Sequence, residues 1–311
     1  SGLTAFAVDN WSEIDVRDGG RLLLGVDAAG APAGVSLGDH AACVFNNVAI
    51  GARYALSKYG LQRILIVDWD LHHGDGTQDV YWHDPDTLFI SLHQDGRTLY
   101  PGTGFSSELG GPGARGATIN IPLPPQTGDE GFLYVMEHLV RPILDHWKPD
   151  LVINSAGQDN HFTDPITNMR LSARGYARMV ELLNPDIAVL EGGYSIQGAL
   201  PYVNLAVILA LAGMDYSHVI EPLWREELVR TSPEAMSYIR DLSEKTLLLY
   251  EHVKDVPHGY KKDGRFWTRD RSVYYDTDGI REQQREEVMD CPDCAGLLVI
   301  RTYTDHQGWS V

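Results

Sequence analysis

Cysteine, basic charge and long apolar runs are all scarce in this sequence. Only 3 cysteines among 311 residues argue against a disulfide framework and agree with a reducing compartment, so we expect a cytoplasmic protein. The longest apolar stretch, LAVILALAG at residues 205–213, is too short to cross a bilayer. The balance of 25 basic against 43 acidic side chains gives a formal net charge of -18, which repels nucleic-acid phosphates. The sequence therefore predicts neither membrane nor nucleic-acid partners.

Strand-like and helix-like segments alternate from residue 41 to about residue 213. Short continuous apolar runs have the length and composition of buried strands, and segments with helical apolar spacing separate them. The predicted strands are QRILIVDWD, TLFISLHQD, GATINIPLP, PDLVINSAGQD and PDIAVLEGGY. The predicted helices are residues 41–60, a segment opened by a capping box at Thr127 to Glu130, a segment capped by Ser172, and a buried helix at 201–213. This alternation predicts an α/β fold, with a mostly parallel sheet covered by helices on both faces.

Polar or glycine-rich residues follow four of the predicted strands at their carboxyl ends. The four segments are IVDWDLHHGDG, FISLHQD, INSAGQDNHFTD and VLEGGY. Open α/β sheets bind their ligands at this edge. A polar turn is the simpler explanation for any one segment, but acidic clusters at several strand ends repel one another unless a cation lies between them. The pattern therefore favours a binding site.

Asp70 and His72 are the first candidates for metal ligands. They alternate with Asp68, so in an extended chain all three side chains point to one face of the strand. The loop after the strand near residue 155 offers three candidates for a third ligand: Asp159, His161 and Asp164. Two carboxylates and one imidazole leave a coordination position open for water, as a catalytic zinc site requires. A second metal would need another acidic residue at Gly74, so we expect one ion.

Four motifs in the same order resemble the zinc-dependent histone deacetylase family: VDWDLHHGDGTQ, SLHQDGRTLYPGTG, SAGQDNHFTDP and LEGGY. The resemblance covers about residues 38–215 and points to the class II and bacterial branches, which include acetylpolyamine amidohydrolases. It implies the arginase-deacetylase fold and hydrolysis of an N-acetyl amide. The implied substrate is an acylated amine, such as acetyl-lysine, an acetylpolyamine or a small amide.

The same resemblance assigns roles to individual residues. Asp70, His72 and Asp164 would bind Zn²⁺, with Fe²⁺ as the alternative, and Tyr194 would stabilise the oxyanion. Asp68, Ser91 and Leu92 would belong to a site for a monovalent cation, K⁺. The residues implied for substrate binding are Gly157 and Tyr100 in a tunnel and His161 near its mouth.

At the position of the general base, this chain departs from the motif of the family. Family members carry two adjacent histidines in an RPPGHHA motif, whereas this chain has SLGDHAACVFNN, with His40 alone. His40 would take the proton from water, and Asp75 would orient its imidazole. Four alternatives stay open: a shortened loop that still works, a loop carrying the histidine pair that is missing from this sequence, an impaired catalyst that binds an acylated ligand, and a His40 that only caps the next helix.

The last third of the chain leaves the family pattern. We expect a catalytic domain at 1–215, atypical over 1–37, and an extension at 216–311 that forms a lid or a contact in a homo-oligomer. A helix starts at the cap Ser232, and two hairpin strands flank a charged helix, IREQQREEVMD. Cys291 and Cys294 have the spacing of half a zinc knuckle, but a reduced pair is the simpler interpretation because only His306 lies nearby.

Overall fold

The computed structural model describes residues 21–26, 32–36, 46–256, 259–275, 280–289 and 297–304. The chain divides into two compact units, residues 1–46 and residues 47–311. In the first unit, β1 (Arg21–Val26) pairs with β2 (Pro32–Ser36) in antiparallel orientation. The domain boundary expected near residue 215 stays a prediction. His40 lies outside the described residues.

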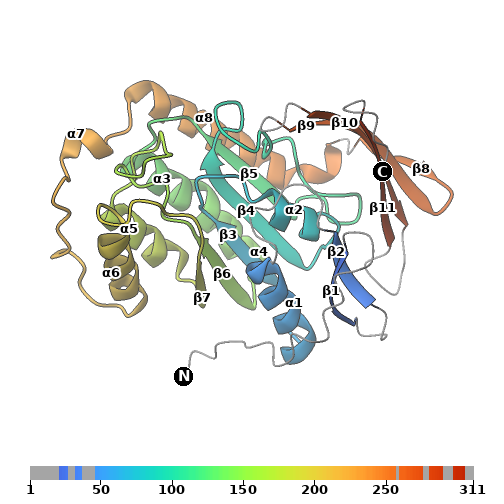
Figure 1. Cartoon of the computed structure of the whole chain (residues 1–311), viewed down its shortest axis with the longest axis horizontal. Coiled ribbons are helices and arrows are strands. Elements are labelled where there is room, and N and C mark those ends of the chain that lie inside the picture. Colours follow the sequence, from blue (N-terminus) through green and yellow to red (C-terminus); the bar gives the residue numbers. More distant parts are fainter. Residues whose placement is uncertain are drawn as a thin grey trace. The chain divides into compact units, whose positions relative to one another are not determined.

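A parallel sheet of five strands forms the centre of the second unit, in the order β5-β4-β3-β6-β7 (Figure 1). The strands are β3 (Ile64–Asp68), β4 (Thr87–Gln94), β5 (Thr118–Leu123), β6 (Leu151–Ala156) and β7 (Ile187–Leu190). Each corresponds to a predicted strand, which confirms the parallel α/β fold. Crossover helices allow this arrangement, because parallel neighbours cannot be joined by a tight turn.

Helices cover both faces of this sheet (Figure 1). Side chains of β3 alternate between two cores, with Leu65 and Val67 on one face and Ile64 and Ile66 on the other. The smaller core takes in buried residues of α1 (Asn47–Tyr59) and α2 (Asp75–Tyr81). The larger core takes in buried residues of the remaining long helices, α3 (Asp129–Val135), α4 (Arg141–Trp147), α5 (Ala173–Leu183), α6 (Leu200–Leu211) and α8 (Pro233–Glu251). Both faces of the central strands are thereby buried.

The start of α3 differs from the predicted capping box. Its cap residue is Gly128, and the Thr127 hydroxyl instead donates to the Pro124 carbonyl at 2.6 Å. The Thr231 hydroxyl, about a hundred residues further along the chain, accepts the backbone N–H groups of Gly128 and Gly131. A tertiary contact thus replaces the local cap. A π-helical turn, η2 (Met136–Val140), joins α3 to α4.

The caps predicted at Ser172 and Ser232 are confirmed. Ser172 accepts the Gly175 N–H ahead of α5, and Ser232 accepts the Ala235 N–H ahead of α8. The prediction that α6 is a buried helix is wrong for one side, because Ile208 is 62% exposed. Two short helices complete this region, α7 (Glu226–Val229) and the 3₁₀ turn η3 (Val253–Asp255).

A small antiparallel sheet follows, in the order β11-β10-β9-β8. Its strands are β8 (Lys261–Asp263), β9 (Phe266–Tyr275), β10 (Ile280–Met289) and β11 (Leu297–Thr304). The predicted charged helix is wrong, because its residues form β10. Glu282, Gln284 and Glu286 alternate as buried residues, and Arg269 and Arg271 of β9 pair with Glu286. This cross-strand pairing outweighs the helical preference of Glu, Gln and Arg. Cys291, Cys294 and His306 lie outside the described residues.

Candidate metal centre

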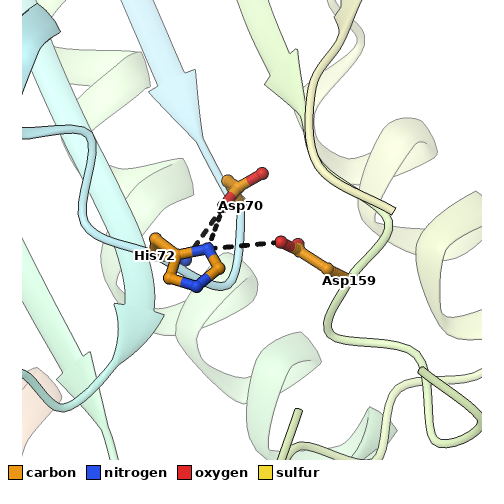
Figure 2. A group of neighbouring side chains, drawn as sticks. All are labelled: Asp70, His72 and Asp159. Carbon is orange, nitrogen blue, oxygen red and sulfur yellow. Dashed lines mark hydrogen bonds and ion pairs between the residues drawn. The ribbon is translucent and has the colours of Figure 1, made fainter. Parts of the chain in front are cut away.

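Asp70, His72 and Asp159 come together at the carboxyl edge of the parallel sheet (Figure 2). Asp70 and His72 lie in the segment that follows β3, and Asp159 lies in the loop that follows β6. β3 and β6 are hydrogen-bonded neighbours, with Asp68 in register with Ser155. The sheet therefore brings two segments about ninety residues apart in sequence to one site.

The distances between these side chains suit a single divalent ion. His72 Nδ1 lies 3.2 Å from Asp70 Oδ1 and 3.4 Å from Asp159 Oδ2. Ligand atoms about 2.0–2.1 Å from a tetrahedral zinc are about 3.3 Å apart, so both distances fit one ion. The His72 side chain is 27% exposed while that of Asp159 is fully buried. The group therefore combines a buried carboxylate with an imidazole that is partly exposed to solvent.

Backbone N–H groups hold the two carboxylates in place. Asp159 Oδ1 accepts the Leu71 N–H at 2.9 Å, and Asp70 Oδ2 accepts the Gly192 N–H at 2.8 Å. Asp70 Oδ1 also accepts the His72 N–H at 2.9 Å. Backbone N–H groups thus hold both oxygens of Asp70 and one oxygen of Asp159, which orients the ligand atoms before any ion binds.

Two glycines leave the space that the carboxylates occupy. A Cβ at Gly192 would lie 2.3 Å from Asp159 Oδ2 and 2.6 Å from Asp70 Oδ2. A Cβ at Gly157 would lie 2.4 Å from Asp70 Oδ2. Any side chain at either position would displace a carboxylate, so the site requires glycine there.

The electrostatics of the cluster also favour a cation. Burial, followed by the charge of Asp70, raises the pKa of Asp68 well above its usual range, and the same two causes raise the pKa of Asp159 to about 6. Burial alone would lower the pKa of His72, but hydrogen bonds that the imidazole donates to Asp159 and Asp70 raise it to about 10. The clustered carboxylates thus attract positive charge, which a divalent ion would supply.

The sequence model of the histone deacetylase domain matches residues 40–211, more than half of the chain. This chain belongs to the histone deacetylase family. A probable deacetylase of Archaeoglobus fulgidus is 50% identical over 200 residues, which cover 59% of this chain and 55% of that protein. A histone deacetylase-like amidohydrolase of Pseudomonas aeruginosa is 35% identical over 190 residues, covering 58% of this chain and 49% of that protein.

Solved structures of histone deacetylases have the same fold. The crystal structure of the HDA15 HD domain superposes with a TM-score of 0.59 at 31% identity, over 70% of this chain and 60% of that one. The predicted arginase-deacetylase fold is therefore confirmed, with a small antiparallel sheet added near the carboxyl end. The chain spans about half the length of the curated relatives that it matches.

Asp164, the third ligand implied by the family resemblance, is not in the group. Its Oδ2 accepts the backbone N–H groups of Tyr194 at 2.7 Å and Ser195 at 3.1 Å. The structure brings Asp159 to Asp70 and His72 instead. In this deacetylase-family chain, Asp164 therefore holds the turn that carries Tyr194, whose side chain is about half exposed.

The residues implied for the monovalent cation lie directly behind the group. Asp68 is in register with Ser91 on neighbouring strands, and both are buried with Leu92. Asp68 Oδ1 accepts the Asp70 N–H at 2.9 Å, and Ser91 Oγ lies 2.8 Å from His93 Nδ1. The K⁺ site of the histone deacetylase resemblance stays a prediction.

The remaining predicted site residues differ in their burial and in their contacts. Gly157 contacts Asp70, as its steric role requires, and Tyr100 is 39% exposed. His161 is fully buried, and its predicted place near the mouth of the tunnel stays a prediction. Asp75 opens α2, and burial followed by the charge of Asp79 raises its pKa to about 7. Its predicted partner in the deacetylase reaction, His40, is outside the described residues.

Two further residues contribute to this region with little or no signal in the sequence. Gly192 is the first glycine of the GGY motif, and the adjacent pair of glycines was the only hint of a close approach. Glu221 contacts His161 from a segment beyond the matched family region, and no motif marks it. Contacts between distant segments can be found only from the fold.

Proposed function

We propose that this chain is a metal-dependent deacetylase that hydrolyses an N-acyl amide of a primary amine. The observation that carries the proposal is the trio Asp70, His72 and Asp159, whose ligand atoms are spaced for one ion at the carboxyl edge of the sheet. Membership of the histone deacetylase family supports the same class of reaction. Zn²⁺ is the expected ion and Fe²⁺ the alternative. Asp159 takes the place that the resemblance gave to Asp164.

A divalent ion at this site would supply a Lewis acid for the attacking water and the acyl carbonyl. Asp159 contributes a fully buried carboxylate whose orientation is fixed by the Leu71 N–H. Tyr194 would donate its hydroxyl to the developing oxyanion. Asp164 would keep the backbone of Tyr194 at a fixed place, since it accepts the N–H of that residue.

A proton acceptor is needed for the attacking water. We propose His40 for this role, oriented by Asp75, as the family resemblance implies. Asp75 would orient the imidazole by accepting a hydrogen bond from it through its carboxylate. K⁺ beside Asp68, Ser91 and Leu92 would offset part of the negative charge behind the site.

The formal net charge of -18 favours a cationic substrate, so we propose acetyl-lysine, an acetylpolyamine or a related small amide. The cytoplasm is the expected compartment. Among the described helices, none combines the length and apolar character needed to cross a bilayer.

Zinc titration of two variants tests the ligand set. We expect Asp159→Asn to weaken zinc binding by more than about a hundredfold, beyond the range seen for residues that only orient ligands. Asp164→Asn should retain zinc, and Asp145→Asn, in an exposed pair with Arg141, serves as a control for the same chemical change. Loss of zinc in Asp164→Asn but not in Asp159→Asn would reinstate the original ligand set.

Turnover on acetyl-lysine peptides, acetylpolyamines and small N-acetyl amides tests the reaction. We expect Tyr194→Phe to lower kcat by about a hundredfold to a thousandfold with zinc retained, as for loss of an oxyanion donor. Unchanged turnover would remove Tyr194 from the reaction. The alternative function is an acyl-binding protein without catalysis, which the single His40 favours. Binding without turnover across all three substrate classes would establish it.

A further inference from the structure

His161, in the loop that contains Asp159, and Glu221 form a fully buried pair. Their side chains are 0% and 1% exposed, and His161 Nε2 contacts Glu221 Oε1. The other carboxylate oxygen of Glu221 accepts the Ala173 N–H at 3.0 Å, at the start of α5. Glu221 therefore connects a loop that follows Asp159 to the amino terminus of a core helix.

The hydrogen bonds of His161 indicate which of its two ring nitrogens carries the proton. The Thr163 backbone N–H donates to His161 Nδ1 at 3.2 Å, so Nδ1 is an acceptor and Nε2 carries the proton that Glu221 accepts. The Thr163 hydroxyl also lies 2.9 Å from Nδ1 and can donate to it. Glu221 thus selects the form of His161 that accepts from Thr163.

The chain of contacts continues to the residue after Tyr194. Thr163 Oγ1 lies 2.8 Å from Ser195 Oγ, and with the Thr163 proton directed at His161, Ser195 becomes the donor. A Cβ at Gly198 would lie 2.6 Å from Thr163 Oγ1 and 2.7 Å from Ser195 Oγ, so glycine leaves room for this pair. The side-chain chain therefore has a single direction of donation, from Ser195 to Glu221.

The Tyr194–Ser195 turn is consequently attached to one loop in two ways. Asp164 accepts both backbone N–H groups of the turn, and Thr163 accepts the Ser195 hydroxyl. His161 hydrogen-bonds Thr163 of this loop, and Glu221 holds His161.

We propose that Glu221 is a positioning residue for Tyr194, acting through His161, Thr163 and Ser195. The proposal rests on the proposed function, since it assigns Tyr194 a place in the deacetylation step. Displacement of a catalytic group by about 1 Å can cost about a hundredfold in rate. Holding the Tyr194–Ser195 turn in place would therefore raise the rate of the deacetylation step.

The surroundings of Glu221 argue against simple packing as its role. It lies beyond the matched family region, in a segment where the adjacent Ile220 is 78% exposed. Burying a charged pair is often no more stabilising than an apolar replacement of similar size. The pair instead fixes the orientation of the His161 ring, because a carboxylate and an imidazole form a hydrogen bond in few relative orientations.

Hydrogen–deuterium exchange on the zinc-loaded protein tests the physical link without any assay of turnover. We expect Glu221→Ala to speed exchange several-fold in peptides that cover residues 191–197, with β4 and β5 unchanged. Thr163→Val, which removes only the hydroxyl link, should do the same, and Thr163→Ser should restore protection. Asp129→Ala is the matched control, because the hydrogen bonds of Asp129 go to Ser172 at the same helix start and not to Glu221 or His161. The proposal would be overturned by exchange that becomes faster across the whole protein, or by exchange in residues 191–197 that does not become faster.

A double-mutant cycle tests the kinetic link. We expect Glu221→Ala to lower kcat by about tenfold to a hundredfold with KM unchanged, and to have little further effect in the Tyr194→Phe background. Additive losses would show that Glu221 does not act through Tyr194. An inactive wild-type protein would refute the proposed function alone, because the exchange experiment still measures whether Glu221 orders the turn.

Discussion

Substitution of Gly192 by alanine should weaken metal binding without unfolding the protein. The added Cβ would lie 2.3 Å from Asp159 Oδ2 and 2.6 Å from Asp70 Oδ2, and Cβ contacts below 3.0 Å are essentially never observed. Asp159 or the Gly192 backbone must therefore move by at least about 0.7 Å, the difference between 3.0 and 2.3 Å. Because both carboxylates are also held by backbone N–H groups, part of this shift reaches the ligand atoms.

Changes that only disturb ligand orientation typically cost 10- to 100-fold in metal affinity, so we expect about 1.4–2.8 kcal/mol of binding free energy to be lost. Isothermal titration with Zn²⁺ measures this loss, and saturating zinc should restore the bound state. Gly51→Ala is the control, since Gly51 lies in α1 with no atom within 4 Å of the added Cβ. Wild-type zinc affinity in a folded Gly192→Ala protein would refute the steric argument.

Three further predictions concern stability. Burial lowers the pKa of His83 to about 4, so the unfolded chain takes up a proton near pH 6.5 before the folded one does, and the contribution of His83 to stability should fall by about 2 kcal/mol from pH 7 to pH 5. Urea unfolding of His83→Phe should lack this component, and an identical pH profile would contradict it. Glu286→Ala leaves Arg269 without its buried partner and should cost about 3 kcal/mol in urea unfolding; a loss below about 1 kcal/mol would mean that the pair behaves as a surface pair. Ser232→Ala removes the acceptor for the Ala235 N–H and should cost about 1 kcal/mol, with Ser232→Asp restoring most of it, whereas an unchanged denaturation midpoint would exclude a capping role.

The parallel sheet could be predicted because its signals are local. Continuous apolar runs such as ILIVD at residues 64–68 have no other stable placement than a strand buried on both faces. The cap at Ser172 was equally readable, since a serine before an apolar helical pattern supplies the acceptor that the first turn needs.

The errors arose where distant residues decide the outcome. Residues 280–289 have the composition of a helix, but their partners are arginines on β9, and pairing in a sheet satisfies the buried carboxylates. Thr127 had the spacing of a cap, yet Thr231 supplies the acceptor.

The choice between Asp159 and Asp164 was beyond the sequence for a similar reason. Both carboxylates lie in one loop, and either spacing is compatible with a third metal ligand. In the structure they differ in which N–H groups each accepts, that of Leu71 for Asp159 and those of Tyr194 and Ser195 for Asp164. Those donors come from other strand ends, so only the folded sheet distinguishes the two residues.

The bonds from Thr231 to Gly128 and Gly131 have a consequence for anyone who trims this protein. A fragment that stopped at residue 211, where the family match ends, would remove the acceptor for these two N–H groups. It would also remove α8, whose Met236, Ile239 and Leu242 belong to the larger core. The region recognised by evolutionary comparison is therefore smaller than the unit that must be expressed for the core to close.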